Sequence, residues 1–202
     1  MKNFMRSSVV LVSILFLSHG LAADRVIIAP LDAVKKKLMH VVTVSARDGD
    51  FTDPVAAVNS IADAAAANPY LVLIGPGVYT LTRTLVMKPF VTISGSGQEA
   101  TTLTGAISTF SYDASSAIIS GTDNGVLCDL AVENIGGSGV SIALYNNGTS
   151  PVIQNVTATA SGGTFNYSVY NEYSSAPTLT EVTTKASGGN YNYGVFNSSS
   201  PR

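Results

Sequence analysis

The sequence predicts an all-β fold, a right-handed parallel β-helix (a solenoid) with a short N-terminal capping helix. Three observations predict this class. Gly-Gly pairs recur every 26 residues, at 136–137, 162–163 and 188–189. Apolar and polar residues keep the same period around them, and from residue 70 onward short strand-like runs alternate with glycine-rich turns. A fixed period of this size is typical of stacked copies of one supersecondary unit.

Residues 1–23 have the pattern of a secretory signal peptide. Lys2 and Arg6 precede an apolar run over residues 9–17, and small residues at 20–23 form a cleavage site. The pattern predicts export to the periplasm, the cell surface or the extracellular space. No later run of 18 apolar residues follows, so we expect no membrane span.

Residues 24–52 are predicted to be an N-terminal lead-in, and residues 53–202 the β-helix domain. The capping helix is expected over 53–68, with Asp53 at the N-cap and Pro54 in the first helical position. An apolar stripe with a spacing of three to four residues supports the helix, and it consists of Val55, Val58, Ile61, Ala62 and Ala65.

The coils of 26 residues begin at about residue 125, and each is expected to contain about three short strands. The inward side chains are predicted to be Leu127, Leu130 and Val132, then Ile153, Val156 and Ala158, then Leu179, Val182 and Thr184. A polar column of Asp129, Asn155 and Glu181 is expected to face water. A leucine-rich repeat shares the apolar spacing, but its helical return segment is missing here, so the β-helix is favoured.

The sequence stops in mid-repeat at Pro201-Arg202. We therefore expect a fragment of a longer repeat protein or a truncated product. An uncapped last coil would expose a strand edge, so edge-to-edge self-association is a second expectation.

The composition argues against several kinds of function. Charged residues are 12% of the chain and the net charge is −2, so no nucleic-acid partner is expected. His40 is the only histidine after the signal peptide, and Cys128 is the only cysteine. No metal site, cofactor or internal disulfide is therefore predicted.

No catalytic residue is predicted either. The sequence has no lysine or arginine between Lys88 and Lys185, which removes the usual base of a polysaccharide lyase from the central coils. A glycoside hydrolase needs two carboxylates about 5–9.5 Å apart. Asp129 and Glu133 would lie roughly 13 Å apart along an extended strand, which is too far.

The most suggestive candidates form two columns in the second strand of each coil. Because Leu144, Val169 and Val195 should point inward, the adjacent rings of Tyr145, Tyr170 and Phe196 are expected to point outward. These rings could stack on sugars, and Asn146, Asn171 and Asn197 could donate hydrogen bonds, which makes the six residues candidate carbohydrate-binding residues. Further aromatic residues near the corners are Phe165, Tyr167, Tyr191 and Tyr193. The alternative is that aromatic and asparagine ladders simply stabilise neighbouring coils.

Residues 41–105 resemble the opening of the pectin-lyase-like superfamily, and of its pectinesterase branch in particular. The matching segments are residues 48–51 (DGDF), 56–58 (AAV), 71–74 (LVLI), 75–79 (GPGVY), 91–97 (VTISGSG) and 102–105 (TLTG). The resemblance implies that the helix caps a right-handed β-helix whose first coils follow. The catalytic set of pectinesterases is two aspartates, an arginine and glutamines. It lies in later segments that have no counterpart here, so no role can be transferred.

Three functions remain open from the sequence. The first is an exported, non-catalytic β-helical scaffold that binds polysaccharide or no ligand at all. The second is a carbohydrate-active enzyme of the pectinesterase or polysaccharide lyase type whose active coils are missing or diverged. The third is an adhesin-like stalk.

Overall fold

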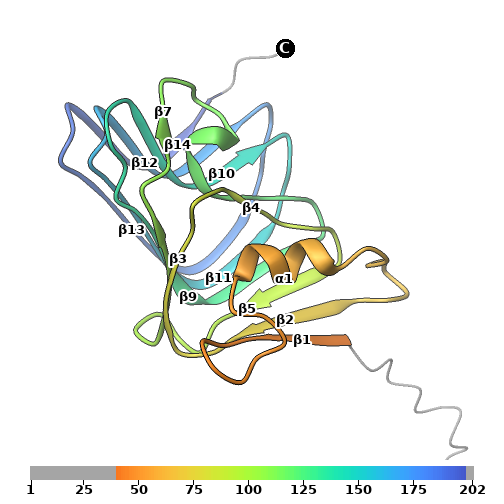
Figure 1. Ribbon diagram of the computed structural model, residues 1–202. Helices are drawn as coiled ribbons and strands as arrows, with labels where there is room; N and C mark the ends of the chain where they lie inside the picture. The colour runs from red at the N-terminus through yellow and green to blue at the C-terminus, as the bar shows by residue number, and fades with distance from the viewer. Residues whose placement is uncertain (1–39, 199–202) are drawn as a thin grey trace, which may run out of the picture. The chain divides into compact units, whose positions relative to one another are not determined.

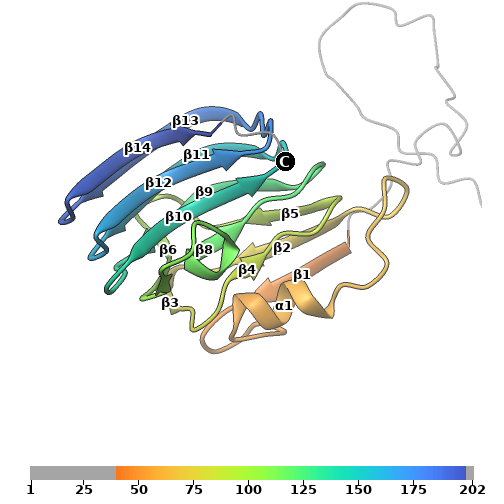
Figure 2. The same ribbon diagram turned by 90° about the horizontal axis from the view of Figure 1, so that it is seen from above.

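The computed structural model describes residues 40–198. The predicted signal peptide, most of the predicted lead-in and the last four residues lie outside this range. Within it, the chain forms a β-helix in which coil after coil stacks through parallel strand pairs, so the predicted all-β solenoid is confirmed. Figure 2 shows the stack running from α1 and β1 at one end to β13 and β14 at the other.

Two sheets form the walls of the helix (Figure 1). The first sheet contains β1 (His40–Val44), β2 (Tyr70–Ile74), β3 (Gly77–Thr80), β5 (Val91–Ser94), β6 (Thr101–Gly105), β9 (Val126–Asn134), β11 (Val152–Ser161) and β13 (Thr178–Ser187). The second contains β4 (Leu85–Val86), β7 (Ser108–Thr109), β8 (Ala117–Ser120), β10 (Val140–Asn147), β12 (Phe165–Glu172) and β14 (Tyr191–Asn197). Within both sheets every strand pair is parallel except that between β7 and β10.

The register of the strands explains the 26-residue period. Leu127 pairs with Ile153 and Ile153 with Leu179, so each residue lies above its counterpart one period away. In the two inner coils the predicted inward side chains are buried, and together with the early strands they form one continuous core. Since parallel strands lie about 4.8 Å apart, this stacking fills the interior with columns of Leu, Ile and Val.

The predicted polar column marks a sharp bend in the first sheet. Asp129, Asn155 and Glu181 have φ values of 58°, 52° and 53°. A left-handed residue turns the chain and shifts the alternation of side chains, which is why the inward residues Leu127 and Leu130 are three positions apart rather than two. In the repeat coils one bent strand thus replaces two of the three expected short strands. The earlier coils keep them separate, since β5 and β6 both pair with β9.

The Gly-Gly pairs lie at the corner between the two sheets. Gly136, Gly162 and Gly188 have φ values of 56°, 80° and 84°, a region that glycine enters without steric cost. A Cβ on Gly162 would lie 2.2 Å from the carbonyl oxygen of Ile135 in the coil below. Close stacking and backbone conformation therefore both require glycine there.

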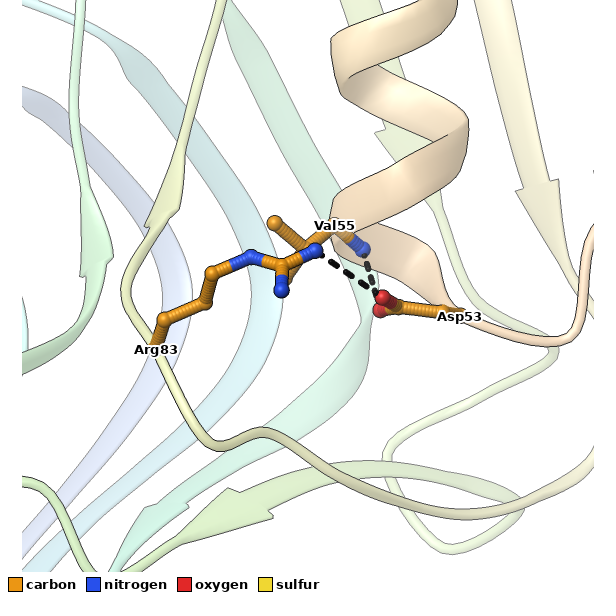
Figure 3. A network of polar contacts seen from close by, with 3 residues as sticks. All are labelled: Asp53, Val55 and Arg83. Atoms are coloured by element: carbon orange, nitrogen blue, oxygen red, sulfur yellow. Dashed lines mark hydrogen bonds and ion pairs between the residues drawn. The ribbon is translucent and has the colours of Figure 1, made fainter.

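Helix α1 (Pro54–Ser60) caps the first coils and packs its buried residues, Val55 and Val58 among them, on the core. Its start is as predicted: Asp53 is the N-cap, and its Oδ1 accepts a hydrogen bond of 2.8 Å from the Val55 amide. The other carboxylate oxygen of Asp53 forms an ion pair of 3.2 Å with Arg83. Figure 3 shows this network. It fastens the helix start to the loop between β3 and β4.

The helix is shorter than the predicted span of 53–68. Its last turn is weakened because the Ser60 hydroxyl donates to the Ala57 carbonyl, a local bond that competes with helix continuation. Lys88 Nζ donates to the carbonyl of Ile61, the C-cap residue, and so satisfies an acceptor that the helix leaves open.

The β-helix also begins earlier than the predicted boundary at residue 53. Strand β1, in the predicted lead-in, pairs in parallel with β2 over five residues from His40↔Tyr70 to Val44↔Ile74. Among the described residues, no helix is long and apolar enough to cross a membrane.

Candidate functional site

The second sheet has its own break in alternation, halfway along each strand. β10 and β12 pair on both sides of Ala143 and Ser168 but not through them. Ala143 and Leu144 both belong to the main core, whereas Ile142 and Tyr145 belong to a second apolar cluster on the outer side. The outer face of this sheet is therefore apolar instead of polar.

Rings dominate that outer cluster, and we call them the aromatic face. Its members are Tyr112, Tyr145, Phe165, Tyr167, Tyr170, Tyr191, Tyr193 and Phe196. Three columns of stacked rings run along the helix axis, with centroid distances of 4.7 Å for Phe165–Tyr191, 5.1 Å for Tyr167–Tyr193 and 5.3 Å for Tyr170–Phe196. Edge-to-face contacts join neighbouring columns, such as Tyr167–Tyr170 at 4.9 Å.

The expectation that Tyr145 and Tyr170 are exposed is wrong. They do point away from the main core, but only 3% and 6% of their surfaces are accessible. Residues 110–116, between β7 and β8, fold over this end of the face. Ala114 packs on the cluster, and the Tyr112 ring contacts both Phe165 and Tyr167. Buried rings of this kind cannot stack on a sugar.

Four rings of the aromatic face are more accessible, three of them in β14, the last described strand. Tyr191 and Tyr193 are 50% and 37% exposed, Tyr112 is 39% exposed, and Phe196 is half-buried. Among the predicted ring candidates only Phe196 thus keeps access to solvent. The rings best placed to receive a ligand are those near the corners and Tyr112.

The candidate asparagines are also buried, contrary to the expectation of a hydrogen-bonding surface. Asn146 and Asn171 are 1% and 4% exposed, and each donates its side-chain amide to the next one: Asn146 to Asn171 at 2.8 Å and Asn171 to Asn197 at 2.8 Å. These hydrogen bonds form the asparagine ladder of the alternative interpretation. Only Asn197, in the last described strand, is exposed.

A groove of about 490 Å³ adjoins the buried end of the aromatic face. It lies where the parallel strands β8, β10 and β12 end, and its lining includes Ser120, Tyr145, Asn147 and Tyr173. The Tyr145 hydroxyl donates a hydrogen bond to Glu172 Oε1 at the end of β12. Burial, then the hydrogen bond to Glu172 and the negative charge of that carboxylate, raise the pKa of Tyr145.

The carboxylates of the coils are held by separate partners. Asp113 caps the short helix η2 (Ala114–Ser116) and accepts from the Ser115 amide, while Asp123 accepts from the Ser150 amide at 2.7 Å. Asp129 accepts from the Asn155 side chain at 2.7 Å. No group of three or more His, Cys, Asp or Glu residues that could hold a metal occurs in residues 40–198.

Cys128 is half-buried, and burial raises its thiol pKa.

Sequence reasoning missed Tyr112, because it lies before the repeats begin and no periodic signal marks it. The main candidates predicted from the sequence, Tyr145 and Tyr170, are covered by residues 110–116. The rings near the corners could be found from the same 26-residue register, since Phe165 pairs with Tyr191 and Tyr167 with Tyr193.

No family model matches the sequence, and no curated protein matches it at a significant level. Solved structures do match by fold. A pectin methylesterase from carrot superposes with a TM-score of 0.56 at 17% identity, over 73% of this chain and 53% of the carrot protein. A pectin methylesterase variant in complex with a hexasaccharide gives a TM-score of 0.53 at 15% identity, over 74% of this chain and 50% of that one.

The chain thus spans about half the length of the solved structures that it matches. Identities this low show the fold alone. The described residues have the right-handed parallel β-helix of pectin-lyase-like proteins, as the resemblance of residues 41–105 implies.

Proposed function

We propose that this protein is an exported, non-catalytic β-helical protein that binds a polysaccharide along the aromatic face. The observation that carries the proposal is the aromatic face itself, in which stacked columns of rings lie outside the main core and, among the described residues, Tyr112, Tyr191 and Tyr193 are exposed. Rigid rings on a sheet present flat apolar area at little entropic cost, which suits the apolar faces of sugar rings.

Two further points support the proposal. Exposed rings grouped on one face of a protein otherwise rich in Ser, Thr and Asn are typical of an interaction site. One of the matched structures, a pectin methylesterase variant, is a complex with a hexasaccharide, so a protein of similar fold can bind an oligosaccharide. The proposed binding residues are the accessible rings of Tyr112, Tyr191, Tyr193 and Phe196. The buried rings of Tyr145 and Tyr170 continue the column in which Phe196 stacks.

The test is binding of the purified protein to a panel of polysaccharides and to the oligosaccharides derived from them. A Tyr191→Ala/Tyr193→Ala variant should lose affinity by roughly 10-fold or more, since each ring contact is worth about 0.5–1.5 kcal/mol. Val78→Ala is the matched control, because Val78 is an exposed apolar residue of β3 in the first sheet. Equal affinity of the two variants, or no binding by the parent protein, would contradict the proposal.

The alternative function is a carbohydrate-active enzyme of the pectinesterase or polysaccharide lyase type, which the fold of the matched pectin methylesterases favours. Release of methanol or of unsaturated uronides from pectin by the purified protein would establish it and would exclude the non-catalytic proposal. Export is tested separately by N-terminal sequencing of protein from the producing cells, which should start after Ala22 or Ala23.

A further inference from the structure

The coil of residues 178–197 consists of β13, the Gly-Gly corner and β14, and we call it the end coil. Among the described residues, β13 pairs only with β11 and β14 only with β12, so each strand has one free edge. The inward side chains of this coil are partly uncovered. Val195 is 45% exposed, although Val169, one coil earlier in the same column, is fully buried. Free strand edges beside an uncovered apolar column are typical of a surface that receives further strands.

The opposite end of the stack has a different surface. Helix α1 lies there, and its residues Val55 and Val58 pack on the core (Figure 2). A second copy that stacked head to tail would meet this helix instead of an open coil. The matching surface on a second copy is therefore its own end coil. A contact between two identical surfaces has two-fold symmetry, and the strands that meet across the axis run antiparallel.

The charges of β13 are complementary in this arrangement. Glu181 and Lys185 are exposed, and neither has an ion-pair partner among the described residues. Thr183, midway between them, is exposed on the same side of the strand, whereas Val182 and Thr184 are half-buried on the other. Residues directly opposite each other in an antiparallel pair lie on the same side. An axis through Thr183 therefore places Glu181 of each copy opposite Lys185 of the other, and the dimer contains this contact twice.

The side chains of β14 fit the same kind of axis. Tyr193 and Phe196 both belong to the aromatic face, whereas Val195 continues the inward column, so the alternation shifts at Gly194. An axis between Gly194 and Val195 places Tyr193 of each copy opposite Phe196 of the other. The same two rings already form an edge-to-face contact within one copy, with a centroid distance of 5.2 Å. Ring thus meets ring across the axis, and inward residue meets inward residue.

A single axis serves both strands. Thr184 and Gly194 face each other across the interior, because a Cβ on Gly194 would lie 2.8 Å from the Thr184 Oγ1 atom. The two points chosen for the axis, at Thr183 and beside Val195, therefore lie at the same level along the strands to within about one residue, or roughly 3.3 Å. The size also fits. A stable interface has about 20–30 residues a side, and residues 178–197 reach the lower end of that range.

We infer that the end coil is an interface for a second copy of this chain and that the protein forms a two-fold symmetric dimer, end coil to end coil. The inference goes beyond the proposed function and does not depend on it. Because the axis passes through both strands, the second sheets of the two copies join with their aromatic faces on the same side. The dimer thereby extends the proposed polysaccharide-binding surface over two copies.

Sedimentation of the purified protein without carbohydrate tests the inference. Over a range of about 1–100 μM, the protein should be an equilibrium mixture of monomer and dimer with no larger species. The dissociation constant of the dimer should rise with added salt, because exposed charge pairs contribute to the contact.

Charge reversals identify the surface. Lys185→Glu and Glu181→Lys each replace two attractive contacts by two repulsive ones, and each should raise the dissociation constant about 10-fold or more. A mixture of these two variants should form a heterodimer, because every contact then joins Glu and Lys again. The double variant Glu181→Lys/Lys185→Glu should return to within about 3-fold of the parent value. Arg47→Glu is the matched control, since Arg47 is exposed in the turn after β1 at the opposite end of the stack, and it should change nothing.

The outcomes distinguish this inference from the proposed function. A monomer at every concentration overturns the inference, and is the result expected if a segment outside residues 40–198 covers the end coil. Species that grow beyond the dimer, or a dimer that responds equally to Lys185→Glu and Arg47→Glu, also overturn it. Each of these results leaves polysaccharide binding untouched, because that binding is measured with ring variants. Failure to bind any polysaccharide likewise leaves the dimer standing.

Discussion

The stacking of the Gly-Gly corners predicts that one substitution will have very different costs in two equivalent positions. Gly162→Ala and Gly188→Ala both place alanine in a left-handed conformation, at φ values of 80° and 84°. For alanine that conformation costs roughly 1–2 kcal/mol. The neighbours differ: the new Cβ at 162 would lie 2.2 Å from the Ile135 carbonyl oxygen, whereas at 188 the nearest atom is 3.6 Å away.

A contact of 2.2 Å with backbone cannot be relieved by a side-chain rotation, so the two coils must move apart at that corner. Overpacking of this kind typically costs a further 1–3 kcal/mol or so. Gly162→Ala should therefore lower the free energy of unfolding by about 2–5 kcal/mol, and Gly188→Ala by about 1–2 kcal/mol. Gly188→Ala thus serves as the control that contains the backbone strain without the clash.

Urea denaturation followed by circular dichroism measures both variants against the parent protein. The m-values must agree for the midpoints to be compared, because a stacked protein can lose its coils in steps. Equal destabilisation by the two variants would refute the reasoning, since it would show that only the left-handed conformation matters and that coil stacking at the corner is loose.

Three further predictions concern the ladders and the bend. Asn171→Ala breaks two rungs of the ladder, leaves the buried Asn146 without its acceptor and should cost about 1–3 kcal/mol of unfolding free energy. Asn197→Ala breaks only the part-buried rung to Asn171 and should cost less than Asn171→Ala; an equal or larger cost would contradict the ladder. Glu181→Asn should raise the thermal midpoint by stabilising about 0.5–1 kcal/mol, because asparagine tolerates the φ of 53° better than glutamate; an unchanged or lower midpoint would contradict this. The pKa of Tyr145 is raised in the folded protein, so its contribution to stability is present below the ordinary tyrosine pKa and is lost as the pH rises through the folded value. Tyr145→Phe should therefore lose less unfolding free energy at alkaline pH than the parent protein does. An identical alkaline loss in the two proteins would contradict the raised pKa of Tyr145.

The repeat and its inward columns were predictable because they depend on period alone. Leu127, Ile153 and Leu179 share a register that parallel stacking requires, and no other knowledge is needed to align them. The same register identified Asp129, Asn155 and Glu181 as a column. That this column turns the chain, instead of simply facing water, depends on backbone dihedral angles, which the residue types only suggest.

The aromatic site was only partly predictable. Alternation along the strand correctly placed Tyr145 and Tyr170 on the side opposite Leu144 and Val169. Alternation says nothing about what covers that side, and the covering segment at 110–116 comes from outside the repeats. Burial of an outward residue is a tertiary property of this kind and cannot be read from a period of two.

Two turns carry side chains that contact a coil beyond the neighbouring one. Tyr112, from the turn before β8, packs against rings of β12, and Gln98, from the turn after β5, accepts a hydrogen bond of 2.6 Å from Thr157 on β11. In both cases the intervening strand, β10 or β9, is bridged. A simple solenoid frays one coil at a time, because each coil touches only its immediate neighbours. Here the loss of the coil formed by β11 and β12 would also release two side chains from the coil formed by β5 and β8, so the central coils should open as one cooperative block.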